Sequence, residues 1–371
     1  MEAIEVISWL LMLMLLLRFC VVMVNWVWIM QLPLDNKMLP AITFPLVSIL
    51  IPARNEALNL PYLLDDIKKL DYPNIEIIVC NDHSTDSTKE VLKSYSANWK
   101  ALSYFDSVDL PEKWMGKNFG CYQLAKKASG NWFLFIDADV RLKSNSISRA
   151  VSYAKNKRLA LLSIFPQQLM FTRGERLTVP VMNWILLSML PLIAVRLPWF
   201  SSLSAANGQF MMFEAEAYKK NQWHRQVWNK NVDDIIIARK MKSQKQSIAV
   251  LTGNDDVLCR MYSSKDEAIN GFARNIHHFF GGMRSWMILF VIVAWVRLPY
   301  FLVMGQWYFF SLSLFLLIIM KTGVAIVSKQ PVYNALYLHF HHLCNMTSMA
   351  FANISNKKQI IWKGRVYNNA I

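Results

Sequence analysis

The hydrophobic positions of this chain follow two different patterns. Near both ends they run almost without interruption, over Ile7–Met30, Trp286–Met304 and Trp307–Val327. Each run is close to the roughly 20 residues that an α-helix needs to cross the hydrocarbon of a bilayer. From Leu46 onward, short apolar runs instead alternate with segments of helical spacing. The pattern therefore predicts membrane-spanning helices at both ends and an α/β domain between them.

Three short apolar runs predict buried strands, at Val47–Ile51, Ile75–Cys80 and Trp132–Ile136. The helices expected between them are Leu58–Leu70, a helix capped by Thr85 or Asp86 that runs to Tyr95, and Cys121–Ala128. Three βα units in succession predict a mainly parallel, doubly wound sheet. In such a sheet the carboxyl ends of the strands meet at one edge, where ligands bind.

The amino-terminal run Ile7–Met30 is predicted to be an uncleaved signal anchor. Glu2 and Glu5 precede it without any lysine or arginine, and no small-residue cleavage site follows, which argues against a cleaved signal peptide. A buried core helix is the alternative. Leu32–Pro45, with three prolines, is predicted to be a linker.

Two further apolar segments are less regular. Thr178–Phe200 contains three prolines and Arg196, and we predict that it is an interfacial segment lying on the bilayer, with an ordinary buried helix as the alternative. Ala335–Ile354 is made polar by the histidines of the segment 339–342, so it is either a third carboxy-terminal span or an interfacial helix.

The charges at the two ends predict the orientation of the chain. With the acidic amino end outside and the basic tail after Lys357 inside, the positive-inside rule favours one amino-terminal and two carboxy-terminal spans. The predicted domains are an anchor over 1–32, a cytosolic domain over 46–278 that includes the interfacial segment 178–200, and membrane helices with a basic tail over 283–371. We therefore expect a multi-pass protein of the cell (inner) membrane.

Composition supports the membrane assignment. Hydrophobic residues make up 54% of the 371 residues, and the formal net charge is +15. A basic chain binds either nucleic acid or an anionic membrane face, and no zinc-finger spacing, aromatic RNA-binding pattern or helix-turn-helix supports nucleic acid. The cysteines are scattered and odd in number, which argues against a disulfide framework or a zinc site and fits a reducing compartment. They are Cys20, Cys80, Cys121, Cys259 and Cys344.

The strand Trp132–Ile136 ends in two carboxylates, Asp137 and Asp139, separated by one small residue. Oxygen-rich side chains at this edge suit a hard cation such as Mg²⁺ or Mn²⁺, which in turn holds the phosphates of a nucleotide. A polar strand end without any ligand is the alternative.

Polar residues also follow the other predicted elements. Asp82 follows the second strand, where a carboxylate can accept hydrogen bonds from a base or a ribose, and Glu56 is placed similarly after the first. Lys117 follows a glycine and can reach a phosphate. Each also has a purely structural explanation: Asp82 as a turn or cap residue, Glu56 as a first-turn acid, and Lys117 as a solvated charge. Their appearance together in one βαβ series favours a nucleotide site.

Four segments in this order resemble the successive motifs of family-2 glycosyltransferases with the GT-A fold. They are Ile51-Pro52-Ala53-Arg54-Asn55-Glu56, Asn81-Asp82-His83-Ser84-Thr85-Asp86, Gly116-Lys117 and Asp137-Ala138-Asp139. The resemblance covers about Leu46 to Arg274 and implies a GT-A doubly wound, mainly parallel sheet, here flanked by transmembrane helices. The segment Trp362–Tyr367 also resembles the end of lipid glycosyltransferases of this family.

The resemblance implies a role for each motif. Glu56 and Asp82 would contact the nucleoside, and Lys117 would lie near the diphosphate. Asp139 would be the principal protein ligand of a divalent cation, Mg²⁺ or Mn²⁺, and Asp137 would contact the ribose or support the metal shell. The residues of the first motif that would also belong to the nucleotide-sugar site are Pro52, Ala53 and Arg54.

Two later segments resemble further motifs of the same family. Asn207–Phe213 is similar to the acceptor-side strand, with Gly208 permitting close approach and Gln209 near the donor sugar. Val232–Arg239 is similar to the Glu-Asp pair that opens a helix and supplies the catalytic base. Here the pair is Asp-Asp, so the first acid is shortened and the second, Asp234, is retained. An acceptor hydroxyl must lose its proton as it attacks, and a carboxylate can take it; a helix cap is the alternative.

The chain departs from the processive members of the family. Their Gln-x-x-Arg-Trp motif is reduced here to the arginine of Gly271-Phe272-Ala273-Arg274-Asn275, whereas Arg260-Met261-Tyr262 is similar to the single-addition members that glycosylate carotenoids, hopanoids and ceramide-type lipids. Arg260 or Arg274 would bind diphosphate, or either is a surface charge.

Together these observations predict an inverting glycosyltransferase. It would move one sugar from a nucleotide-diphosphate sugar to a hydroxyl of a membrane lipid, and nucleic acid is not expected as a partner. A processive polysaccharide synthase or polyprenyl-phosphate glycosyltransferase is the first alternative, and a non-catalytic membrane scaffold is the second. The motifs leave open the donor sugar, the nucleobase, the lipid and the oligomeric state.

Overall fold

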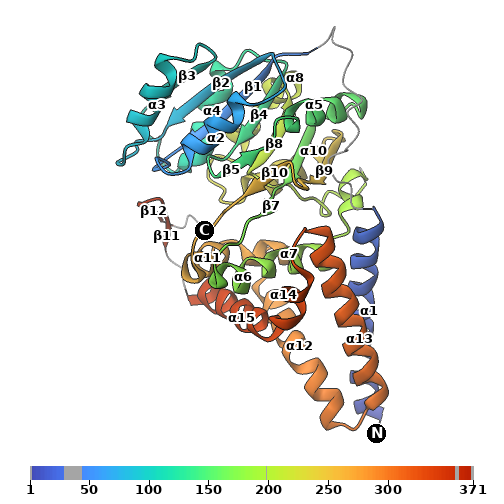
Figure 1. Ribbon diagram of the computed structural model, residues 1–371. Helices are drawn as coiled ribbons and strands as arrows, with labels where there is room; N and C mark the ends of the chain where they lie inside the picture. Colours follow the sequence, from blue (N-terminus) through green and yellow to red (C-terminus); the bar gives the residue numbers. More distant parts are fainter. Residues whose placement is uncertain (1, 29–43, 198, 356–358, 369–371) are drawn as a thin grey trace. The chain divides into compact units, whose positions relative to one another are not determined.

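The structure is a computed structural model that describes residues 2–28, 44–197, 199–355 and 359–368 (Figure 1). The chain forms two compact units. The sheet unit comprises Met30–Gln167, Val195–Arg260 and Gln359–Ile371, and the helical unit comprises Met1–Ile29, Gln168–Ala194 and Met261–Lys358. Neither unit is continuous in sequence, because the segment Gln168–Ala194 leaves the sheet unit and the tail returns to it.

The sheet unit is built on a seven-stranded sheet of order β3-β2-β1-β4-β8-β6-β9. The strands are β1 (Val47–Ala53), β2 (Ile75–Asn81), β3 (Leu102–Asp106), β4 (Trp132–Ile136), β6 (Leu161–Phe165), β8 (Phe210–Glu214) and β9 (Ile248–Thr252). All neighbours pair in parallel except β8, which runs antiparallel to both β4 and β6. The prediction of a mainly parallel α/β sheet is confirmed.

Burial explains why the central strands carry continuous apolar runs. Every residue of β4 is buried, and β1 lies between β2 and β4 with only Pro52 partly exposed. A parallel strand covered on both faces has no polar side to present, so its sequence is apolar throughout. The helices of this unit are α2 (Leu60–Lys68), α3 (Thr88–Ala97), α4 (Gly116–Lys127), α5 (Ser146–Asn156), α8 (Ala215–Asn221), α9 (Trp223–Gln226) and α10 (Asp233–Ser243).

Two smaller sheets complete the sheet unit: one of three strands in the order β5-β10-β7, with β7 at Gln167–Gln168, and one of two strands, β11-β12. β5 (Val140–Leu142) pairs with β10 (Val257–Cys259), and β11 (Gln359–Trp362) pairs with β12 (Arg365–Asn368) in a hairpin. The short strand β7 (Gln167–Gln168) lies where the chain passes from the sheet unit to the helical unit.

The helical unit contains three helices that are long and apolar enough to cross a membrane, counted over the part of the chain that the structure describes. They are α1 (Glu2–Trp28), α12 (Arg284–Val303) and α13 (Trp307–Val327), which correspond to the three predicted spans. The remaining elements are α6 (Arg173–Thr178), α7 (Pro180–Met189), α11 (Lys265–Ala273), the 3₁₀ helix η2 (Ile276–Phe280), α14 (Val332–Tyr337) and α15 (His339–Ser355), with the 3₁₀ helix η1 (Leu192–Arg196) following α7.

The segment predicted to be interfacial, 178–200, begins with a buried helix. Residues 180–188 of α7 are almost all buried, and the helix packs against α1 and α13. Asn25 of α1 donates hydrogen bonds to the carbonyls of Leu187 and Leu190, both at 2.8 Å. These contacts support the alternative of a buried helix for this part of the segment, whereas Trp199 and Phe200 at its end are exposed.

The polar segment near the carboxyl end forms α15, which is not among the helices apolar enough to span. Two of its buried polar side chains bond within the unit: Asn345 donates to the carbonyl of Leu177 at 2.6 Å, and His342 contacts the carbonyl of Arg176 at 3.0 Å. The predicted linker lies outside the described residues except for its last two positions, and the predicted domain limits stay a prediction.

Candidate functional site

Four carboxylates lie at the carboxyl ends of neighbouring parallel strands. β1 leads into Glu56, β2 into Asp82, and β4 into Asp137 and Asp139. Because β2 and β4 flank β1 in parallel, the three strand exits lie at the same edge of the sheet. We call Glu56, Asp82, Asp137 and Asp139 the acidic edge.

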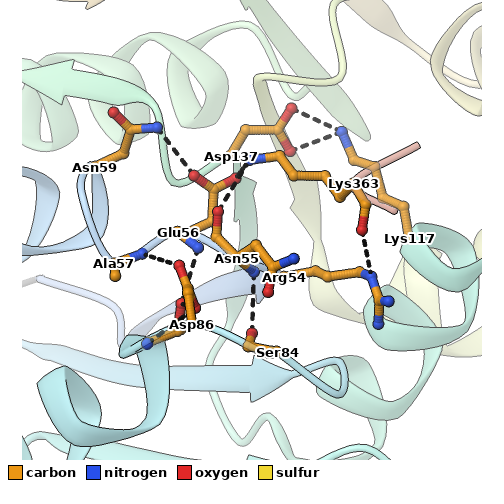
Figure 2. A network of polar contacts seen from close by, with 11 residues as sticks. Arg54, Asn55, Glu56, Ala57, Asn59, Ser84, Asp86, Lys117, Asp137 and Lys363 are labelled. Carbon is orange, nitrogen blue, oxygen red and sulfur yellow. Dashed lines mark hydrogen bonds and ion pairs between the residues drawn. The ribbon is translucent and has the colours of Figure 1, made fainter. Parts of the chain in front are cut away.

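Lys117 is paired with one member of the acidic edge. It lies in the first turn of α4, with its Nζ 2.6 Å from Oδ1 and 2.8 Å from Oδ2 of Asp137 (Figure 2). Burial alone would lower the pKa of Lys117, but the carboxylates of Asp137 and Asp233 outweigh it and hold this pKa above its ordinary value. Lys117 therefore remains a cation at physiological pH.

Asp139 differs from its neighbours because one of its oxygens is not satisfied. Its Oδ1 is buried and has no hydrogen-bond partner among the described residues. Burial, with the negative charges of Asp137 and Glu56, raises the pKa of Asp139 to about 7. A buried carboxylate oxygen without a donor is a natural ligand for a hard cation.

The residues present therefore fit a divalent cation, although they do not enclose one. The described residues hold no group of three or more His, Cys, Asp or Glu side chains arranged to bind a metal ion. A cation at Asp139 would take its remaining ligands from phosphate oxygens and water, which is how Mg²⁺ is commonly held beside a nucleotide. The partner of Asp137 is already Lys117, so Asp139 is the better ligand.

Asp233 and Asp234 open α10, as the sequence predicts. Oδ2 of Asp234 accepts a hydrogen bond from the backbone amide of Gly208 at 3.0 Å, and Oδ1 accepts from that of Ile235 at 2.8 Å. Gly208 thus lies between the two charged groups of the site: a Cβ there would come 3.4 Å from Nζ of Lys117 and 3.6 Å from Oδ2 of Asp234.

Burial raises the proton affinity of the two aspartates that open α10. It raises the pKa of Asp234 above its ordinary value and that of Asp233 to about 7. His224 lies 3.8 Å from Asp233, but burial and the charge of Lys117 lower the pKa of His224 to about 3, so the imidazole is neutral and forms no ion pair. An aspartate with a raised pKa and fixed orientation is suited to accept a proton near neutral pH.

The carboxy-terminal hairpin supplies two cations to the acidic edge. Arg365 contacts both carboxylate oxygens of Asp82, at 2.8 and 2.9 Å. Nζ of Lys363 lies 2.7 Å from Oε1 of Glu56 (Figure 2). Arg54 holds the turn in place by donating from Nε to the carbonyl of Lys363 at 3.1 Å and from a terminal nitrogen to that of Asp82 at 2.7 Å.

Sequence reasoning did not find these contacts of Lys363 and Arg365. The glycine of Lys363-Gly364 was a sequence signal for a hairpin, because two-residue hairpin turns favour glycine. In the structure both residues have positive φ, 47° and 78°. The docking of this turn on loops about 280 to 310 residues earlier in the chain is not visible in any local pattern.

The structure places the other predicted site residues as follows. Pro52 and Ala53 end β1 directly below the acidic edge. Gln209 is buried, and its Nε2 donates to Sγ of Cys259 at 2.7 Å. Arg260 follows β10 and is exposed, whereas Arg274 ends α11 in the helical unit. The functional roles of all five residues stay predictions.

Comparison with known proteins gives the class. Residues 48–221 match the family described as glycosyl transferase family 2. The chain is 25% identical over 261 residues to the 4,4'-diaponeurosporenoate glycosyltransferase of Staphylococcus haemolyticus, covering 67% of this chain and 66% of the relative. It is 28% identical to the protein of the same name from Staphylococcus aureus strain USA300, covering 67% of this chain and 65% of the relative. The chain thus spans just under two thirds of these relatives.

A solved structure shares the fold. The mannosyltransferase of Pyrobaculum calidifontis, determined in complex with GDP-Man and Mn²⁺, matches with a TM-score of 0.55 and 16% identity, covering 96% of this chain and 99% of that one. The fold is therefore GT-A-like, and residues 48–221 of this chain form a glycosyltransferase family 2 domain.

Proposed function

We propose that this protein transfers a single sugar from a nucleotide-diphosphate sugar to a membrane lipid, with inversion at the anomeric carbon. The observation that carries the proposal is the composition of the acidic edge. The edge holds a carboxylate oxygen of Asp139 that is buried without a hydrogen-bond partner among the described residues, and Lys117 is paired there with Asp137. Asp234, oriented by the amide of Gly208, lies on the other side of Gly208 from Lys117. These are the groups that a negatively charged leaving group and an attacking acceptor require.

The donor would lie along the acidic edge. Asp82 and Glu56 would face the nucleoside, with Arg365 and Lys363 balancing their charges. Lys117 would approach the diphosphate from the amino end of α4, where backbone amides also favour anions. A divalent cation bound at Asp139 would stabilise the charge that develops on the departing diphosphate. The complex of the solved neighbour with GDP-Man and Mn²⁺ supports this assignment.

Asp234 would act on the acceptor. Its carboxylate is held by the amides of Gly208 and Ile235, so its orientation is set before the acceptor binds. It would take the proton of an acceptor hydroxyl as the oxygen attacks the anomeric carbon. Direct displacement from the side opposite the leaving group would invert the anomeric configuration.

A carboxylate acceptor is the second candidate, favoured by the names of the two curated relatives, which denote a carotenoid acid. A carboxylate attacks without losing a proton, so it would depend far less on Asp234 than a hydroxyl would. The three apolar helices support a membrane-embedded acceptor in either case. We further propose that the domain carrying the acidic edge lies on the cytosolic side.

The test is transfer to lipid. Membranes containing the full-length protein would be incubated with a panel of radiolabelled nucleotide sugars and extracted into organic solvent. We expect one donor to label a lipid with a single sugar residue, and Asp139→Asn to prevent this. A polymeric product would favour a processive synthase instead, and unchanged labelling with Asp139→Asn would contradict the proposed donor site.

A further inference from the structure

The helical unit gathers three cationic side chains from its three apolar helices: Arg18 of α1, Arg297 of α12 and Lys321 of α13. Arg297 and Lys321 are only 3% and 4% exposed. The Arg18 guanidinium lies 5.0 Å from the ring of Trp184, and Nζ of Lys321 lies 4.3 Å from a ring of the same residue. We call Arg18, Arg297 and Lys321 the cation cluster.

The members of the cation cluster are close enough for their charges to interact. Arg297 repels Arg18, and Arg18 repels Lys321. His339, at the start of α15, also lies within the field of all three. The cluster is therefore a single region of positive potential in the interior of an apolar bundle.

The described part of the unit provides no counter-ion for this charge. None of the three cations forms an ion pair with a described residue. Glu2 and Glu5 are exposed at the start of α1, and the carboxylate of Glu175 caps α6. The other two acids of the unit, Asp266 and Glu267, are exposed in the first turn of α11.

Hydrogen bonding also leaves the cluster incomplete. Nε of Arg18 and Nε of Arg297 are buried without a hydrogen-bond partner among the described residues. Arg18 donates one bond, to Oγ of Ser188 at 2.9 Å. Contacts with aromatic rings stabilise a cation by less free energy than the burial of an uncompensated ion costs. Without a bound anion, the cation cluster therefore lowers the stability of the folded protein. A bound anion would compensate the buried positive charge.

We propose that the cation cluster binds the anionic group of a lipid, a carboxylate or a phosphate carried on an apolar chain. Two arginines and a lysine match such a group in charge and in donor geometry. A lipid is the expected carrier because all three cations lie on helices apolar enough to cross a membrane, among rings such as Trp184 and Phe290. The proposal rests on the proposed function only in expecting a membrane lipid as a substrate.

Two sources offer this chemistry: an acidic acceptor lipid and an anionic phospholipid of the bilayer. Palmitate serves as a probe for the first and phosphatidylglycerol for the second. Hexadecanol and phosphatidylcholine are the uncharged and zwitterionic counterparts with matched apolar chains. A lipid site that recognises charge must separate each probe from its counterpart.

The experiment uses the purified full-length protein in phosphatidylcholine nanodiscs. Binding of each probe would be measured by native mass spectrometry, and the melting temperature would be recorded with and without it. Lys321→Met and Arg297→Met remove one cation each at nearly constant length, and Lys265→Met removes an exposed lysine of the same unit as the matched control. Because each buried substitution removes an uncompensated charge, neither should lower the melting temperature in the absence of an anionic lipid.

We expect at least one anionic probe to bind about tenfold or more tightly than its counterpart, and to raise the melting temperature of the wild type and of Lys265→Met. Lys321→Met and Arg297→Met should lose this preference. Preference for palmitate alone assigns the site to an acidic acceptor, and preference for phosphatidylglycerol assigns it to the bilayer. The proposal is overturned if neither probe is preferred, or if both substitutions leave the preference intact. Nucleotide-sugar binding, measured in the same samples, separates this failure from failure of the proposed function.

Discussion

The acidic edge of the sheet unit and the cation cluster of the helical unit differ in how their buried charges are paired. At the acidic edge, three of the four carboxylates have a cationic partner: Lys117 on Asp137, Arg365 on Asp82 and Lys363 on Glu56. Of the four, Asp139 alone keeps a buried oxygen that has no hydrogen-bond partner within the described part of the chain. The cation cluster has no such internal pairing among the described residues. The charge left over at each region indicates its ligand, a cation with phosphates at the first and an anion at the second.

The largest effect is expected at Asp139. Asp139→Asn keeps the size of the side chain and removes the charge that would hold a cation opposite the departing diphosphate. Transfer should fall by about 10³-fold, the upper range for loss of a transition-state electrostatic contact. Asp109→Asn, at an exposed position, is the control and should leave the rate unchanged. A loss of less than tenfold at Asp139 would remove it from the catalytic site.

The second effect concerns Asp234 and depends on the acceptor. With a hydroxyl acceptor, Asp234→Asn should lower kcat by about 10²-fold, because no carboxylate remains to take the proton. With a carboxylate acceptor the loss should be much smaller. The pH profile provides a check, because the pKa of Asp234 is raised by burial and only its deprotonated form is a base. The rate should therefore fall as pH falls through that raised pKa, and the contribution of Asp234 to this acid limb, apart from that of Asp139, should be absent from the variant.

The sequence was sufficient to predict the acidic edge but not its partners. β4 is a continuous apolar run, β1 and β2 are apolar apart from Ser48, Glu76 and Asn81, and the acids follow within three residues, so the position of the site could be predicted. β3 escaped prediction because its residues are half-exposed and mixed in character. Two features depend on packing between segments that are distant in sequence, so no local sequence pattern predicts them. They are the tail contacts of Lys363 and Arg365 and the proximity of Arg18 to Lys321.

A third effect tests the tail contact. Arg365→Gln removes the bidentate partner of Asp82 and leaves that buried carboxylate uncompensated next to an anionic donor. We expect KM for the nucleotide sugar to rise about tenfold with little change in kcat. A tenfold change corresponds to the free energy of one hydrogen bond to a charged group. Arg225→Gln, exposed on α9, serves as the matched control. A fall in KM would instead show that the tail competes with the donor for Asp82.

The smallest effect is the pH dependence of metal binding. The pKa of Asp139 is raised to about 7, and a carboxylate must be deprotonated to bind a cation. Affinity for Mn²⁺ should therefore rise with pH until it passes this pKa, by about fourfold between pH 6.5 and pH 8. Titration calorimetry at the two pH values measures this difference. An affinity independent of pH, or equal in Asp139→Asn, would place the metal elsewhere.

The contrast between the two regions is tested most directly by melting temperatures measured with two ligands and two variants. Wild type, Asp139→Asn and Lys321→Met would each be heated with Mn²⁺ plus uridine or guanosine diphosphate, and separately with palmitate or phosphatidylglycerol. We predict that Asp139→Asn loses only the response to Mn²⁺ and nucleotide, and that Lys321→Met loses only the response to the anionic lipid. If either variant keeps both responses, the charge left over in that region does not select its ligand.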